Sequence, residues 1–149
     1  MLYNLQKAIM DKWNEAGSAT LRGLVSGLFE DEAPSDIALT TQTGEILSQD
    51  VKPFITFSVL FASEKHSFCS NFLEPIVEFT IHGDANNKSS ILLLQISDAF
   101  LAVYGDVLLD MEDGYTMVRN DTNNRSKLKD GEKMWNVIIE LEFIIEKDR

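Results

Sequence analysis

The sequence WNVIIELEFII at residues 135–145 alternates between apolar odd positions and mostly polar even positions. Period-two alternation of this length predicts a β-strand with one face in a core and the other face outward. The outward face is not purely polar, because Met134, Ile138 and Ile144 share it with Glu140 and Glu142. A face that mixes apolar and acidic side chains is suited to packing against another surface.

Hydrophobic periodicity predicts further helices and strands before this strand. Leu5, Ile9 and Trp13 recur at helical spacing, which indicates an amphipathic helix at the start of the chain. Asp113-Gly114 is a strong hairpin turn signal. In chain order, the predicted elements are a helix over 2–13, a short helical stretch over 19–29, strands over 54–61 and 73–82, a helix over 88–104, hairpin strands over 107–109 and 115–119, a polar loop over 121–132 and the final strand.

This order of elements favours the α+β class, with an antiparallel sheet of about four main strands and two helices packed on one of its faces. The main order is helix, strand, strand, helix, strand, strand. We expect one domain over residues 1–149, a usual length for a single domain. Residues 30–52 are acidic at first and then rich in Thr, Gln and Gly, and we expect a mobile arm there.

Charge and composition exclude several classes of protein. Acidic residues outnumber basic ones 24 to 13, a formal net charge of −11, which argues against a protein that wraps nucleic acid. An acidic surface can still serve beside DNA that has to pass without sticking. The single cysteine cannot form an internal disulfide, and we find no signal peptide and no membrane-spanning run, so we expect a cytosolic protein.

The chain offers few candidates for catalysis or metal binding. Cys69 and His66 are a possible nucleophile and base, but no third group is placed to orient the base. His82 ends a strand, where a cap or a solvent contact is the simpler interpretation. With two histidines and one cysteine there is no zinc-site spacing, and residues 110–114 lack the alternating oxygen ligands of a calcium loop. Glu140 and Glu142 share a strand face, which we interpret as a solvated or interface stripe. We expect no enzyme, cofactor or metal.

The outward face of the sheet is the candidate site. Glu74, Glu78 and the glutamates of the last strand all project from it, and like charges directly opposite destabilise a sheet. Either those strands are not neighbours, or bases from elsewhere meet the acids. The apolar residues would also form a large exposed patch unless the arm or another chain covers them. The predicted subunit interface comprises Phe54, Leu60, Ile76, Met134, Ile138, Ile144, Glu140, Glu142, Arg125, Lys127 and Lys129.

The basic residues of the predicted polar loop supply one possible partner for these acids. Arg119 and Lys133 flank Arg125, Lys127 and Lys129. If this loop reached a neighbouring subunit, the contact would be head-to-tail, and such contacts close into rings. The alternative is screening of the acids by solvent within one chain.

Several short motifs resemble those of the tail terminator and tail-completion (head-tail joining) proteins of long-tailed bacteriophages and prophages. The likeness lies in LYNLQKAI at 2–9, in Ala33-Pro34 followed by PFITF at 53–57, in VEFTI at 77–81 before a helix over 90–104, and in the closing strand. The stretch 36–52 is longer than the family pattern, and its role stays open.

The resemblance implies a structural protein of the virion. Its members form a ring, typically a hexamer, at the head-proximal end of the tail tube, which ends tube growth and contacts the head connector. The implied partners are further copies of the chain, the tail tube protein and the head connector protein, with DNA passing through the lumen and no membrane. Such a protein is assembled in the bacterial cytoplasm. The alternative is a small monomeric ligand-binding or hydrolytic α+β domain with a cavity between its sheet and helices.

Overall fold

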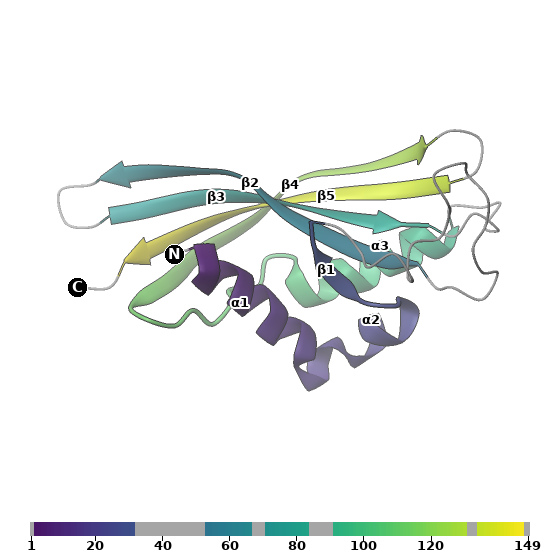
Figure 1. Ribbon diagram of the computed structural model, residues 1–149, viewed down its shortest axis with the longest axis horizontal. Helices are drawn as coiled ribbons and strands as arrows, with labels where there is room; N and C mark the ends of the chain where they lie inside the picture. Colours follow the sequence, from purple (N-terminus) through teal and green to yellow (C-terminus); the bar gives the residue numbers. More distant parts are fainter. Residues whose placement is uncertain (1, 32–52, 67–70, 84–90, 131–133, 148–149) are drawn as a thin grey trace.

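The computed structural model describes residues 2–31, 53–66, 71–83, 91–130 and 134–147 (Figure 1). The helices are α1 (Leu2–Asn14), α2 (Ala19–Leu24) and α3 (Ile91–Tyr104), with a 3₁₀ turn over Ala16–Ser18 between the first two. The strands are β1 (Leu28–Glu30), β2 (Phe54–His66), β3 (Asn71–His82), β4 (Tyr115–Asp130) and β5 (Met134–Lys147). The predicted α+β class is confirmed.

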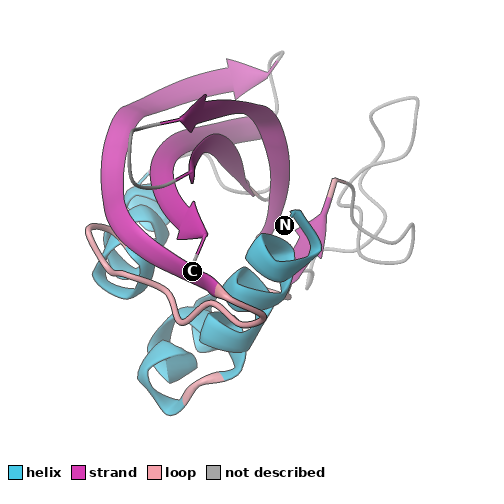
Figure 2. Cartoon of the chain, turned by 90° about the vertical axis from the view of Figure 1, so that its left-hand side faces the viewer, coloured by secondary structure: helices cyan, strands magenta, loops and turns pink. Residues whose placement is uncertain are grey.

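The strands form one mixed sheet in the order β1-β2-β3-β5-β4. The pairs β2–β3, β3–β5 and β5–β4 are antiparallel, as predicted, whereas β1 pairs with β2 in parallel. Strand β5 lies between two long strands, β3 and β4. This position explains why its residues alternate strictly between the core and the other face of the sheet. Viewed end-on in Figure 2, the long strands curl strongly rather than lying flat.

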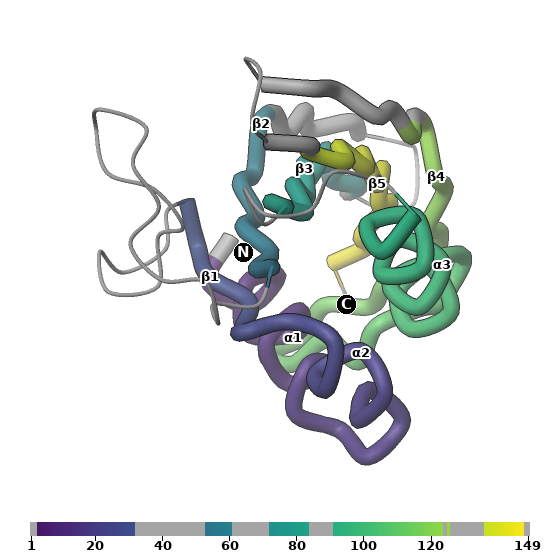
Figure 3. Tube along the Cα trace, turned by 90° about the vertical axis from the view of Figure 1, so that its right-hand side faces the viewer, coloured from purple at the N-terminus to yellow at the C-terminus, as the bar shows by residue number. Residues whose placement is uncertain are grey.

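The helices cover one face of this sheet and lie on one side of it in Figure 1. Figure 3 shows α3 beside β4 and β5, whereas α1 and α2 lie nearer to β1 and β2. Val77, Phe79 and Ile81 on β3 and the odd positions from 137 to 145 on β5 are buried, and so are Leu5, Ile9, Ile96 and Phe100 on the helices. Burying a side chain of this size stabilises the fold by roughly 1.5–3 kcal/mol. The apolar positions of the last strand are therefore the ones that face the core.

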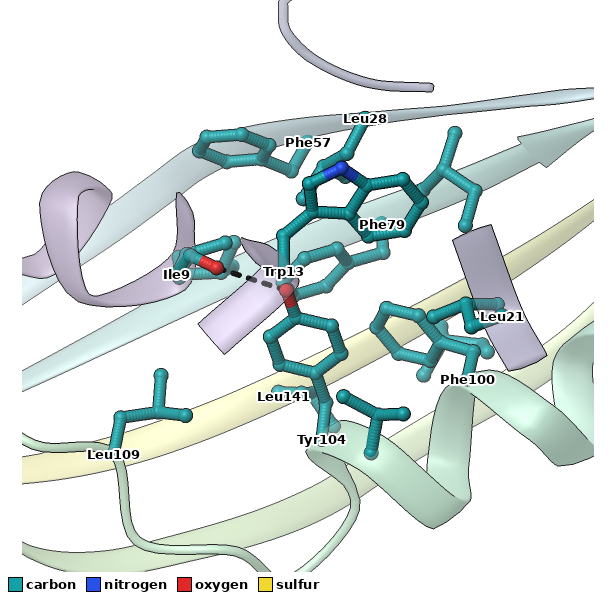
Figure 4. Packing of buried hydrophobic residues seen from close by; sticks show 14 of the residues in the cluster. Ile9, Trp13, Leu21, Leu28, Phe57, Phe79, Phe100, Tyr104, Leu109 and Leu141 are labelled. Atoms are coloured by element: carbon teal, nitrogen blue, oxygen red, sulfur yellow. Dashed lines mark hydrogen bonds between the residues drawn. The ribbon is translucent and has the colours of Figure 1, made fainter. Parts of the chain in front are cut away.

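Two polar contacts fix the helices inside this core. The hydroxyl of Tyr104 on α3 donates a 2.8 Å hydrogen bond to the carbonyl oxygen of Ile9 on α1 (Figure 4). The side-chain amide of Asn120 on β4 donates to the carbonyl oxygens of Tyr104 and Val107, at 2.6 and 2.8 Å. Buried polar groups need such partners, because an unpaired one costs about 1–3 kcal/mol.

The structure corrects the prediction of a helical stretch over 19–29. Helix α2 ends at Leu24, and Leu28 and Phe29 belong to β1. Backbone hydrogen bonds from Ser26 to Pro53 and from Ile55 to Gly27 attach this segment to β2. The described sheet therefore has five strands rather than four, and the described part of the chain has three α-helices rather than two.

The predictions after α3 are also partly wrong. Residues 107–109 form no strand, and Asp113 and Gly114 turn the chain with positive φ angles of 58° and 82° directly into β4. The expected polar loop over 121–132 is strand up to Asp130. Backbone pairing to β5 holds it, and bulges at Val118 and Asn123 interrupt the alternation that would have indicated a strand. Most of the expected arm, 32–52, lies outside the described residues.

Candidate functional site

The sheet face opposite the helices, which we call the outer face, is the candidate site. Its members are the even positions of the two central strands: Glu74, Ile76, Glu78, Thr80 and His82 on β3, and Asn136, Ile138, Glu140, Glu142, Ile144 and Glu146 on β5. All of them are partly exposed, whereas the odd positions from 137 to 145 are buried. Within the described residues, no helix packs on this face (Figure 1).

The apolar part of the outer face is smaller than the sequence predicts. Ile76, Ile138 and Ile144 lie on it as expected. Phe54, however, is only 7% exposed, because it stacks on His82 at 4.5 Å between ring centroids and meets Phe29 edge-on at 6.5 Å. Expecting Phe54 to be exposed was therefore wrong.

Leu60 and Met134 are the remaining two apolar residues of the predicted interface. Leu60 is exposed but is the extra residue of a bulge in β2, so that Phe61 rather than Leu60 pairs with Ile76. The side chain of Met134 lies outside the described ones.

The acidic residues of the outer face do stand opposite each other. Glu78 pairs in register with Glu140, because β3 and β5 are neighbours. Glu142 lies between Ile76 on β3 and Asp121 on β4. Of the two alternatives from the sequence, the first is therefore excluded: these strands adjoin. Packing against the acids would favour a partner surface with positive charge.

Four of the basic residues predicted to answer these acids lie on β4 rather than in a loop, namely Arg119, Arg125, Lys127 and Lys129. The fifth, Lys133, lies outside the described residues. Arg125 makes a 2.8 Å ion pair with Asp98 on α3, and Arg119 makes one of 2.5 Å with Asp121 on its own strand. All four residues are well exposed, so these pairs contribute about 0–1 kcal/mol and leave both arginines able to exchange partners. Lys127 and Lys129 also belong to β4, at the positions paired with Val137 and Trp135.

The candidate catalytic groups are used in structural contacts or lie outside the described residues. The Nε2 atom of His82 lies 2.9 Å from the hydroxyl of Thr56, and the ring stacks on Phe54. Cys69, which the sequence paired with His66, is not among the described residues. Asp113 accepts a hydrogen bond from the side-chain amide of Asn4 at 2.9 Å, which fits a turn rather than a calcium loop.

The described residues offer few other kinds of site. Within the described ranges, no group of three His, Cys, Asp or Glu side chains is placed to hold a metal ion. No helix there is both long and apolar enough to cross a membrane. An open apolar hollow of about 530 Å³ lies between α1 and β1, lined by Tyr3, Met10, Leu28 and Phe29 among others. Its size and apolar lining suit a small ligand.

The strand edges are a feature that sequence reasoning missed. Strand β1 covers only Ile55, Thr56 and Phe57 of β2, and no described strand pairs with that edge from Ser58 to His66. At the other end of the sheet, the outer edge of β4 has no described partner strand along its sixteen residues. Strand β4 is too polar to show an alternation of apolar residues along its full length. The sequence therefore could not predict this edge.

Comparison with known proteins identifies a fold. No protein-family model matches the chain. No curated protein matches it either. Among solved structures, it is similar to a chain of the "Virion of native gene transfer agent (GTA) particle", with a TM-score of 0.66 and 13% sequence identity. The match covers 97% of this chain and 96% of that one. The likeness in fold therefore extends over nearly the full length of both chains.

Proposed function

We propose that this protein is a structural subunit of a phage-like virion that acts by assembling with copies of itself and with neighbouring virion proteins. Its place in the particle would be the head-proximal end of the tail tube, as a tail terminator or tail-completion protein. A ring of copies there would end tube growth, contact the head connector and let DNA pass. Likeness to a virion chain over nearly the full length supports this proposal.

The observation that carries the proposal is the outer face, on which no helix of the described residues packs (Figure 1). Three isoleucines lie there among five glutamates, opposite a fully formed core. These isoleucines are partly exposed, and a cluster of apolar side chains that water can reach suits a contact surface. We propose that the subunit contact uses the following members of the predicted set: Ile76, Ile138, Ile144, Glu140 and Glu142 on the outer face, and Arg125, Lys127 and Lys129 on the edge strand β4.

The charge of the chain fits this role. DNA binding depends on Lys and Arg that replace counterions on phosphates, and the chain has almost twice as many acidic residues. A conduit with a negative wall repels the DNA backbone and would not hold it in transit. The protein would thus contribute contacts between proteins and no chemistry, and its location would be the virion, after assembly in the bacterial cytoplasm.

A small ligand-binding or hydrolytic domain is the second candidate, and the hollow between α1 and β1 favours it. About 530 Å³ with an apolar lining is within the range of small-molecule sites. Such a protein would stay monomeric at all concentrations and would gain thermal stability from a small molecule.

Light scattering across a concentration series tests the proposal. We expect a ring, or an equilibrium between monomer and ring, for the unmodified chain. The double substitution Ile138→Asp with Ile144→Asp should abolish association and tail assembly while the far-ultraviolet circular dichroism stays unchanged. The matched control replaces two apolar residues exposed on α3, Ile91→Asp with Leu94→Asp, and should still associate.

Two results would contradict the proposal. A strict monomer that a small molecule stabilises would favour the second candidate. Unfolding of the outer-face variant, with the α3 control folded, would show that the outer face belongs to the core of a single chain.

A further inference from the structure

We infer that copies of this chain join edge to edge, with β4 of one copy pairing beside the open half of β2 in the next. The inference rests on the proposed function, because it requires self-association, and it names the strands that would make the contact. The two edges lie at opposite ends of the described sheet, with β1 and β2 on one side and β4 on the other (Figure 3).

The described sheet has two edges along which no described strand pairs. Strand β2 continues for nine residues past its last pairing with β1, and β4 has sixteen residues, with no described strand on the outer edge of either. Unpaired N–H and C=O groups along an edge are a template for another strand. Joining different edges of identical copies is a head-to-tail contact, which builds rings when the rotation closes.

Strand direction is compatible with this pairing. Strand β4 runs antiparallel to β5, β5 to β3, and β3 to β2, so β4 runs antiparallel to β2. A second copy placed beside the first in one continuous sheet keeps these directions. The joint between β4 and the next β2 is therefore antiparallel, which is the more stable ladder.

Charge is distributed so that the two edges complement each other. Strand β4 holds four basic residues and two acidic ones in a chain whose net charge is −11. The open part of β2 begins where Glu30 and Asp31 lie, both exposed, and Asp31 accepts a 2.7 Å hydrogen bond from the hydroxyl of Ser58. A basic edge would thus meet an edge that starts with two carboxylates.

The bulges distinguish this arrangement from an edge protected against association. Natural edges are often protected by bulges, charges and prolines. Here, the extra residues at the first bulge of each edge are Leu60 and Val118, both apolar and exposed at 53% and 42%. Protection would call for polar residues at those positions, whereas apolar ones gain free energy only if a neighbour covers them.

Disulfide trapping tests the inference directly. In a Cys69→Ser background, Leu60→Cys is combined in turn with Val118→Cys, Asn123→Cys and Arg125→Cys, so that different registers are sampled. Within one copy β2 and β4 are three strand spacings apart, about 14 Å, which exceeds the reach of a disulfide. Oxidation of the assembled protein should therefore give a ladder of dimers, trimers and higher multimers for at least one combination.

The control is read in the same way, as a ladder of disulfide-linked multimers. Leu60→Cys with Thr20→Cys, an exposed residue on α2, should give no ladder. If the protein is oligomeric by light scattering but no β4 position exceeds this control, the edge contact is wrong while the proposed function stands. If the protein is a strict monomer and forms no ladder, both fail.

Reversal of charge provides an independent measurement. Lys127→Glu with Lys129→Glu should weaken association at least tenfold. Adding Glu30→Lys with Asp31→Lys should restore it, because the attraction is rebuilt with opposite signs. Absence of rescue in variants that remain folded would overturn the charge complementarity between the two edges, and with it the inference.

Discussion

Glu78 on β3 and Glu140 on β5 are register partners, so two carboxylates stand directly opposite each other on the outer face. Both side chains are partly exposed, which lets water screen the repulsion. Directly opposed like charges still destabilise a sheet. The outer face therefore carries an electrostatic cost within one copy that a positively charged partner surface would relieve.

Replacing one of these carboxylates should stabilise the isolated chain. We expect Glu78→Gln to raise the free energy of unfolding by about 0.2–1 kcal/mol in urea denaturation at low salt, and the gain should shrink as salt increases. The matched control is Glu146→Gln, because Glu146 lies between Phe72 and Thr116 and faces no carboxylate in register. Equal effects of the two substitutions would show that net charge, rather than the opposed pair, is responsible.

The alternation of apolar residues was sufficient to predict the central part of the fold. It located most of β2, β3 and β5, together with helices α1 and α3, because each of these elements buries apolar side chains along one face. The same alternation identified the outer face, because the polar even positions of β3 and β5 point away from the core. Periodicity works where burial dominates.

The missed elements are those that packing does not determine. Strand β1 has three residues and depends on parallel pairing with β2, a contact distant in sequence. The second half of β4 is held by its backbone against β5 and has few apolar residues to form a pattern. Predicting that Phe29 and His82 bury Phe54 likewise required knowing the positions of three separate segments.

Asn120 should be the most important polar side chain of β4 for stability. Its amide donates to the carbonyl oxygens of Tyr104, the last residue of α3, and of Val107 just beyond it, and Asn120 is 5% exposed. We expect Asn120→Ala to lower the free energy of unfolding by about 1–3 kcal/mol, because it leaves Tyr104 and Val107 without these donors. Asn123→Ala, on the same strand but exposed, should change it by less than about 0.5 kcal/mol. Similar losses from both would contradict a specific role for Asn120.

The hydroxyl of Tyr104 should contribute through its bond to the carbonyl oxygen of Ile9. Tyr104→Phe keeps the ring contacts with Phe79 and Phe100 and removes only this hydrogen bond between α1 and α3. The expected loss is about 1 kcal/mol in thermal or urea unfolding. Tyr3→Phe is the control, since Tyr3 is largely exposed, and an equal loss there would show that the Tyr104 bond contributes nothing particular.

The same residue predicts a loss of stability in alkaline solution. Burial raises the pKa of Tyr104 well above its ordinary value, and the carboxylate of Glu15 raises it further. The folded chain therefore retains the proton at a pH where the unfolded chain releases it, beginning near the ordinary tyrosine pKa of about 10. A group whose pKa is raised by folding contributes stability below its unfolded pKa and loses it as pH rises toward the folded value.

Comparison of the unmodified chain with Tyr104→Phe isolates this effect, because all other titrating groups are common to both proteins. From about pH 10 upward, the free energy of unfolding of the unmodified chain should fall more steeply than that of the variant, by up to about 1.4 kcal/mol per pH unit. The advantage of tyrosine over phenylalanine should therefore shrink and then reverse. Urea titrations at half-unit steps between about pH 9 and 11.5 measure both curves. Parallel curves over that range would mean that Tyr104 ionises as easily in the folded chain as in the unfolded one, which would contradict its burial against Ile9 on α1 and Phe79 on β3.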